Sequence, residues 1–254
     1  MKLPLHEYIL LLLEVIALAS LITRLLVSGL ARLYKYFFCY LIVDLLETIA
    51  PFVIGFGELY GYVYFAFQCI KLCFYVLIVF ELYSVLLRDM KGIARMAKRY
   101  SVIALVISVM ISVFVVTALP LPHHPLRKLF YVEIPIISIL VLFIVLIEVY
   151  LTYYPVVLHR NALVYTTGYF VFFISKTALL VLINLHQTAS VRIFSAILGY
   201  VELGCVVFWT IFLNRAGEER QMSVGSSWST PERQQQVLDH LRALNDTLLR
   251  SRPR

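Results

Sequence analysis

Long runs of apolar residues, separated by short polar or turn-forming segments, fill the first 213 positions of the chain. A helix needs about 20 residues to cross the hydrocarbon core of a bilayer. Seven stretches meet this requirement, namely Glu7–Ser28, Lys35–Gly55, Tyr60–Leu87, Tyr100–Leu119, Leu129–Tyr154, Ala162–Leu185 and Val191–Leu213. The segments GFGELYG (55–61) and PLPHHP (120–125) between them contain the glycines and prolines of turns. The pattern predicts an all-α membrane protein with a seven-transmembrane-helix bundle in residues 1–214.

Composition supports lipid, and not water, as the main surroundings of this chain. Of the 254 residues, 61% are hydrophobic and 15% are charged, and the mean hydropathy is +0.88. Soluble domains contain roughly half apolar and a quarter charged residues, and a chain of this size cannot hide the excess in a core. The net charge of +7 does not indicate nucleic-acid binding, because no basic face is interleaved with aromatic stacking residues.

Lysine and arginine are unevenly distributed between the connections of the predicted spans. One side has eleven of them: Arg24, Arg32, Lys35, Arg88, Lys91, Arg95, Lys98, Arg99, Arg160, Arg215 and Arg220. The other side has four: Lys2, Arg127, Lys128 and Arg192. Because basic residues collect on the cytoplasmic side, we expect the N-terminus outside and the C-terminus in the cytoplasm. A multi-pass protein of the bacterial cytoplasmic (inner) membrane is the expected setting.

Five ionisable residues fall near the middle of predicted spans: Asp44, Glu47, Lys71, Lys176 and Glu202. Each costs about 2.5–3.5 kcal/mol if it faces lipid, so we expect these residues to lie inside the bundle and to pair. Consecutive helices are usually antiparallel neighbours. This rule predicts that both carboxylates of the second span pair with Lys71 of the third. It also predicts that Lys176 of the sixth span pairs with Glu202 of the seventh.

These residues and Gln68, which shares a helix face with Lys71, form a candidate intramembrane polar site. Its predicted members are Asp44, Glu47, Gln68, Lys71, Lys176 and Glu202. Glu14 and Glu133 fall in the outer portions of their spans, so the polar interior is expected to open outward. Two interpretations are open. The charges either set helix register and packing, or they hold a ligand or a proton.

The sequence has none of the common motifs for catalysis or cofactor binding. No GxxxxGK[ST] loop, GxGxxG turn, HExxH helix or GxSxG elbow occurs, and the four cysteines show no metal-ligand spacing. Retinal-binding rhodopsins carry a Schiff-base lysine on the seventh helix, whereas the seventh span here carries Glu202 and no lysine. We therefore expect no enzyme activity, no metal and no cofactor.

The chain becomes polar after Leu213. Residues 215–229 predict a flexible linker, and residues 230–254 predict a cytoplasmic amphipathic helix and tail. Pro231 suits the first turn of this helix, and its apolar seam is a candidate partner-binding surface formed by Val237, Leu241, Leu244 and Leu248. A helix this short needs an apolar surface to be stable in water. A partner helix or second copy, the bundle itself, and the membrane surface are the open alternatives.

Five segments in order, RLLVSGLARLYKYFFCYL, FELYSVLL, YPVVLHRN, NRAGEERQ and LRALNDTLLR, carry a resemblance that covers nearly the whole chain. They resemble a family of small bacterial membrane proteins with seven transmembrane helices. The resemblance implies the same topology, and it supplies no activity and no catalytic or binding residue.

Three functions are open for such a protein. The leading hypothesis is a receptor-like or sensor-like protein that couples the polar intramembrane site to the cytoplasmic helix. A transporter of a small solute, or a proton-coupled carrier that uses Asp44, Glu47 and Glu202, is the second. An accessory or structural subunit of a membrane complex is the third. The expected partners are the lipid bilayer and, through the tail helix, another protein or a second copy; the ligand is not predicted, and nucleic acid is not expected.

Overall fold

The computed structural model describes residues 5–55, 57–87, 91–118, 125–153, 156–185, 191–219 and 221–224, and positions 239, 243, 245 and 247 of the tail. Its long helices are α1 (Leu5–Ser28), α2 (Lys35–Ile54), α3 (Glu58–Leu86), α4 (Lys91–Ala118), α5 (Pro125–Tyr153), α6 (Arg160–Leu185) and α7 (Val191–Phe212). The shorter elements are the 3₁₀ helix η1 (Leu30–Arg32), α8 (Arg215–Glu219), and the strands β1 (Val156–His159) and β2 (Gln221–Val224).

Six helices, α1, α2, α3, α5, α6 and α7, contain described stretches that are long and apolar enough to cross a membrane. The nearly all-helical structure confirms the predicted class, and the chain is an integral, multi-pass membrane protein. The helix α4 is not among the six, so the count of seven spans stays a prediction, as does the orientation. Its outer face nevertheless exposes large apolar side chains, including Val106, Met110 and Phe114.

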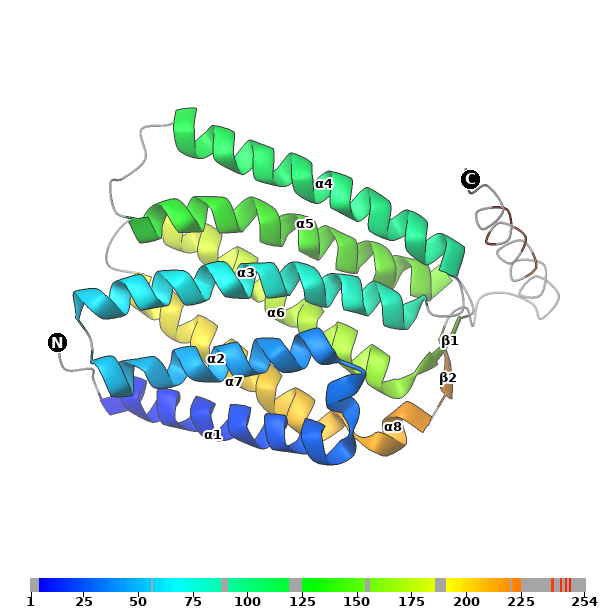
Figure 1. Cartoon of the computed structure of the whole chain (residues 1–254), viewed down its shortest axis with the longest axis horizontal. Coiled ribbons are helices and arrows are strands. Elements are labelled where there is room, and N and C mark those ends of the chain that lie inside the picture. The colour runs from blue at the N-terminus through cyan, green and yellow to red at the C-terminus, as the bar shows by residue number, and fades with distance from the viewer. Residues whose placement is uncertain are drawn as a thin grey trace.

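The long helices lie side by side in a bundle (Figure 1). The helix α1 packs on α2 and α7, α2 packs on α3, α5 packs on α3 and α6, and α6 packs on α7. At one edge, α4 packs mainly on α5. Gly55 ends α2 because it adopts a left-handed conformation (φ 75°), and its backbone N–H donates to the carbonyl of Pro51.

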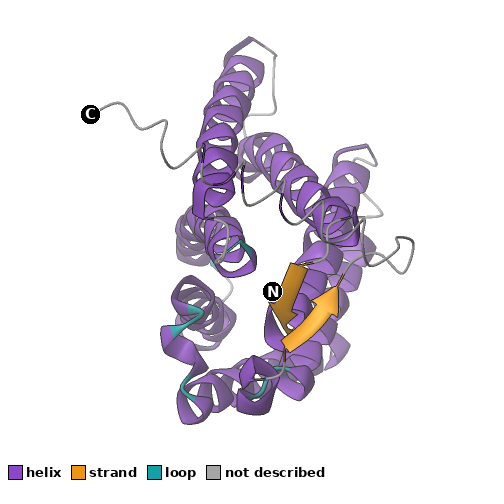
Figure 2. Ribbon diagram, turned by 90° about the vertical axis from the view of Figure 1, so that its right-hand side faces the viewer, coloured by secondary structure: helices purple, strands orange, loops and turns teal. Residues whose placement is uncertain are grey.

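A two-stranded antiparallel sheet at one end of the bundle departs from the all-helical expectation (Figure 2). β1 lies in the connection between α5 and α6, and it pairs with β2 of the tail from Val156 opposite Val224 to His159 opposite Gln221. Residues 215–219 and 221–224, which composition predicts to be part of a flexible linker, form α8 and β2. We call the end that carries β1 and β2 the sheet end.

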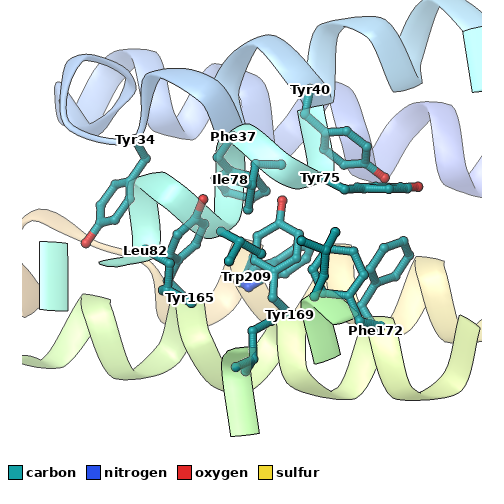
Figure 3. Packing of buried hydrophobic residues seen from close by; sticks show 14 of the residues in the cluster. Tyr34, Phe37, Tyr40, Tyr75, Ile78, Leu82, Tyr165, Tyr169, Phe172 and Trp209 are labelled. Carbon is teal, nitrogen blue, oxygen red and sulfur yellow. The ribbon is translucent and has the colours of Figure 1, made fainter. Parts of the chain in front are cut away.

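A group of buried rings fills the interior between the middle of the bundle and the sheet end (Figure 3). This aromatic core consists of Tyr34, Phe37, Tyr40, Tyr75, Tyr165, Tyr169, Phe172, Phe173 and Trp209. Gly168 permits the closest approach in it, since a Cβ atom at this position would lie 2.2 Å from Nε1 of Trp209. The missing side chain therefore lets α6 and α7 pack tightly through the indole ring.

Candidate functional site

A polar cavity of about 220 Å³ lies among α1, α2, α3, α6 and α7. All six residues of the predicted intramembrane site line it, and Glu14 of α1 joins them. Whether they act as a functional site stays a prediction, but the structure brings Asp44, Glu47, Gln68, Lys71, Lys176 and Glu202 together around one space.

The predicted pairing of α2 with α3 matches the structure. The Nζ atom of Lys71 lies 2.7 Å from Oδ1 of Asp44 and 2.7 Å from Oε2 of Glu47. Asp44 and Glu47 are three residues apart, so both point from one face of α2 toward α3. Gln68, three residues before Lys71, donates from Nε2 to the other oxygen of Glu47 at 2.9 Å. One ammonium group is therefore shared by two carboxylates.

The predicted partner of Lys176 is wrong. The Nζ atom of Lys176 lies 2.7 Å from Oε1 of Glu133 on α5, and it donates to the hydroxyl of Tyr75 on α3 at 2.9 Å. The same ammonium group lies 4.6 Å from the centroid of the Tyr75 ring. The side chain of Lys176 therefore points toward α5 and α3, and not toward Glu202 on the adjacent α7.

Glu202 instead belongs to a second group of charges. Its Oε1 accepts a hydrogen bond of 3.3 Å from the hydroxyl of Tyr40. Carboxylate oxygens of Glu202, Glu14 and Asp44 all lie within 4.8 Å of one another. We call these three residues the carboxylate triad.

Glu14 is a buried acid that no described residue pairs with. Its relative exposure is 9%, and within the described part of the chain no hydrogen bond or ion pair reaches its carboxylate. The Oδ2 atom of Asp44, a residue with 2% exposure, also has no hydrogen-bond donor among the residues that the structure describes. Because a buried polar atom without a partner is costly, these atoms mark the part of the cavity where a ligand would be stabilised.

The charges around the cavity do not balance. Four carboxylates, those of Glu14, Asp44, Glu47 and Glu202, and the two ammonium groups of Lys71 and Lys176 line the cavity. Glu133, which is paired with Lys176, adds a fifth carboxylate to the group. In fully ionised form the group has three excess negative charges. In a low-dielectric interior such an excess is strongly unfavourable, so the site favours protons or a cationic ligand.

The cavity extends from the middle of the bundle toward the end opposite the sheet. Its lining includes Leu11, Pro51, Tyr60, Ile183 and Ser195, and each lies within about two turns of the helix terminus at that opposite end. Toward the sheet end, the cavity is followed by the buried rings of the aromatic core (Figure 3). The first of these are Tyr40, bonded to Glu202, and Tyr75, bonded to Lys176, whose ring centroids lie 5.5 Å apart. The cavity is therefore blocked on one side in this conformation.

Beyond the aromatic core, α6 and α7 end in a hydrogen-bonded assembly with β1, α8 and β2, which we call the tail junction. Asn161 of α6 donates from Nδ2 to the carbonyl of Asn214 at 2.7 Å, and the side chain of Asn214 accepts from the backbone N–H of Gly217 at 2.6 Å. Arg24 of α1 donates from Nε to the carbonyl of Leu213 at 2.9 Å, which places a cation at the C-terminus of α7. The tail is thus held to the ends of the helices that line the cavity.

Tyr34 connects the junction to the turn before α2. Its hydroxyl donates to Oε2 of Glu218 at 3.3 Å. Burial, and then the nearby Glu218 carboxylate, raise the pKa of Tyr34 above its usual range, so the hydroxyl stays protonated and able to donate.

The predicted seam of the tail helix, Val237, Leu241, Leu244 and Leu248, lies outside the described residues. Of the described tail positions, Asn245 accepts a hydrogen bond of 2.7 Å at Oδ1 from the backbone N–H of Gly92 near the start of α4. This contact favours the bundle itself as one surface on which the tail rests.

Four residues that contact this site, Glu14, Tyr40, Tyr75 and Glu133, are not among its six predicted members. The sequence pattern did mark the two acids as part of a polar interior that opens outward. Their depth near the outer ends of the predicted spans kept them out of the predicted site, since charges there can reach water. Tyr75 shares a helix face with Lys71, four residues before it, whereas Tyr40 carried no such signal, because tyrosine is common throughout this chain, with 17 in all.

Searches against models of protein families, curated proteins and solved structures find no match to this chain. Function is therefore inferred from the geometry of the cavity and its connections.

Proposed function

We propose that this integral membrane protein is a receptor or sensor that binds a small ligand in the polar cavity and passes the change to the tail junction. The observation that carries the proposal is that the same two helices contribute to both places. The helix α6 carries Lys176 at the cavity and Asn161 at the junction, and α7 carries Glu202 at the cavity and ends at Leu213 and Asn214.

A ligand can shift a conformational equilibrium only if it binds one state better than the other. The arrangement of charges offers such a difference, because Lys71 is shared by two acids while the Glu14 carboxylate has no hydrogen-bond or ion-pair partner among the described residues. A ligand drawn toward the triad would pull Glu202 and alter the position of α7. Because an α-helix is stiff, a displacement at Glu202 would be transmitted along the helix to the hydrogen bonds of Leu213 and Asn214.

The junction is suited to report this displacement. It joins the α5–α6 connection to the tail through the β1–β2 pairing, and the tail meets α4 through Asn245 and Gly92. The role proposed is one of binding and coupling, without catalysis. Transport is the second candidate, since the acids line a cavity in the membrane, but the aromatic core blocks the way to the sheet end.

The test is a distance measurement at the sheet end that requires no known ligand. Spin labels on unnatural amino acids at Arg32 and Glu219, both exposed, leave the native cysteines in place. In lipid nanodiscs, Glu202→Gln should shift the distance distribution between the labels, because it removes one charge of the triad. The control, Glu148→Gln, removes an acid of α5 that does not line the cavity and should leave the distribution unchanged.

If Glu202→Gln gives the same distribution as the parent, cavity and junction are not coupled and the proposal fails. A steady cation flux into liposomes that depends on Glu202 would favour the transporter instead.

A further inference from the structure

We propose that the carboxylate triad of Glu14, Asp44 and Glu202 binds a divalent cation of the size of Ca²⁺. That this ion is the ligand the protein senses rests on the proposed function. That the triad binds the ion depends only on the geometry of the cavity.

The spacing of the triad suits one ion. Its three carboxylate groups offer oxygen atoms within 4.8 Å of one another. Ca²⁺ binds oxygen at about 2.3–2.6 Å, so two ligands on opposite sides of it are roughly 5 Å apart. An ion between the three residues can therefore touch all of them with side-chain adjustments only. Mg²⁺, with oxygen distances of about 2.0–2.1 Å and a strict octahedral geometry, would have to draw the same oxygens closer together than Ca²⁺ does.

The burial of Glu14 points independently to a ligand. This side chain is about nine-tenths buried, lines the cavity and has no hydrogen bond or ion pair within the described part of the chain. Beside it, Oδ2 of Asp44 also has no hydrogen-bond donor among the described residues. The other acids in or next to the cavity each have at least one polar partner: Lys71 and Gln68 for Glu47, Tyr40 for Glu202, and Lys176 for Glu133, which does not line the cavity itself. Glu14 is the exception, and a cation at the triad would give it a partner.

The two lysines are already engaged, and of the triad only Asp44 is paired with one of them. Lys71 lies between Asp44 and Glu47, and Lys176 is paired with Glu133. Of the three excess negative charges, a divalent ion removes two, whereas a monovalent ion or an organic ammonium group removes one. Carboxylate oxygens are also the ligands that hard divalent cations prefer.

The cavity has room for the rest of the coordination shell. Ca²⁺ takes about six to eight oxygen ligands. Three carboxylates can supply some of them through bidentate contacts, and water molecules supply the rest. A volume of about 220 Å³ accommodates several water molecules beside the ion. The lining extends toward the end of the bundle opposite the sheet, through Pro51 and Tyr60, so this is the side from which an ion would enter.

The experiment is isothermal titration of the full chain in lipid nanodiscs after treatment with EGTA. CaCl₂, MgCl₂, NaCl and ethylammonium chloride are titrated separately. We expect saturable binding of Ca²⁺, and weaker binding of the other three. Loss of a charged ligand should weaken Ca²⁺ binding at least about tenfold in Glu14→Gln and in Glu202→Gln, whereas Glu148→Gln should bind as the parent does.

Glu14→Gln is the sharper variant, because Glu14 has no hydrogen bond or ion pair to a described residue that it could lose. If Glu14→Gln does not fold, Glu202→Gln provides a second test. The proposal is overturned if the parent shows no saturable Ca²⁺ binding, which would leave protons to balance the charge. It is equally overturned if neither variant weakens binding, or if Na⁺ or ethylammonium binds more tightly than Ca²⁺. If Glu202→Gln shifts the distance between the spin labels but the parent does not bind Ca²⁺, only this inference is refuted. If the parent binds Ca²⁺ but Glu202→Gln leaves the label distance unchanged, only the proposed function is refuted.

Discussion

The two halves of the bundle interior are built from the same apolar helices but are stabilised in different ways. The polar cavity gathers charged side chains from α1, α2, α3, α6 and α7, while the aromatic core fills the space toward the sheet end with packed rings. In the cavity, the energy depends on specific partners, because charges in a low dielectric attract or repel strongly. In the core it depends on close packing, in which many weak contacts add up.

Two buried acids, one in each half, illustrate the difference between the halves. Glu81, near the sheet end, accepts hydrogen bonds from the backbone N–H groups of Tyr36 and Phe37 at 3.1 and 3.2 Å and from the hydroxyl of Tyr165 at 3.3 Å. It thereby caps the N-terminus of α2, where free N–H groups and the helix dipole favour a carboxylate. Glu14 has no hydrogen-bond donor among the described residues. A buried acid with donors serves the fold, whereas one without them is available to a ligand.

The largest loss of stability is expected from Lys71→Met, which removes the shared cation of the polar cavity. It leaves Asp44 and Glu47 buried without their shared cation, and loss of one partner of a buried ion pair costs about 3–5 kcal/mol. The free energy of unfolding, measured by denaturant titration in detergent micelles, should fall accordingly. Lys35→Met, at an exposed lysine, is the matched control. Equal stability of the two variants would show that ion pairs do not hold this half together.

A smaller and more specific effect should identify the partner of Lys176. Lys176→Met leaves the Glu133 carboxylate unpaired, and Glu133→Gln should restore part of the lost stability, with a coupling energy of about 0.5–3 kcal/mol. The double mutant with Glu202→Gln should show a smaller coupling, because that acid is hydrogen-bonded to Tyr40. Unfolding titrations of the four variants in each cycle measure both couplings. A larger coupling to Glu202 than to Glu133 would contradict the geometry.

An effect smaller than that of Lys71→Met is expected in the aromatic half, from Gly168→Ala. The new methyl group would meet the Trp209 ring at 2.2 Å, and overpacking of this kind costs about 1–3 kcal/mol. Gly204→Ala on α7 is the control, because no atom lies within 4 Å of its added Cβ. Thermal unfolding in detergent, monitored by tryptophan fluorescence, should show a lower Tm for the first variant only. Unchanged unfolding of both would mean that α6 and α7 can separate without cost.

Much of the fold was predictable because the information for a membrane span is local. A run of apolar residues must form a helix in lipid, since its backbone has no other hydrogen-bond partners. The predicted span Lys35–Gly55 corresponds to α2 (Lys35–Ile54), and Val191–Leu213 corresponds to α7 (Val191–Phe212). The pairing of Lys71 was predictable for a related reason, because α2 and α3 are joined by a short turn and lie next to each other.

What depended on packing between distant helices was not predictable. Lys176 and Glu202 lie on consecutive, contacting helices, yet Lys176 turns toward Glu133 of α5. The rotation of each helix about its own axis decides which side chains meet, and this rotation is set by contacts on all sides of the helix at once. The β1–β2 sheet was unpredictable for the same reason, since each strand forms only because a segment distant in the sequence pairs with it.

By itself, then, the sequence determined that most of this chain is helical and surrounded by lipid, and that its charged residues at membrane depth have to find partners. Only the tertiary structure decided how those charges are divided. It gave one lysine two acids, gave the other lysine an acid on α5, and left Glu14, Asp44 and Glu202 facing one another. Hydropathy is a property of each segment, whereas a balance of charge is a property of the space that several segments enclose.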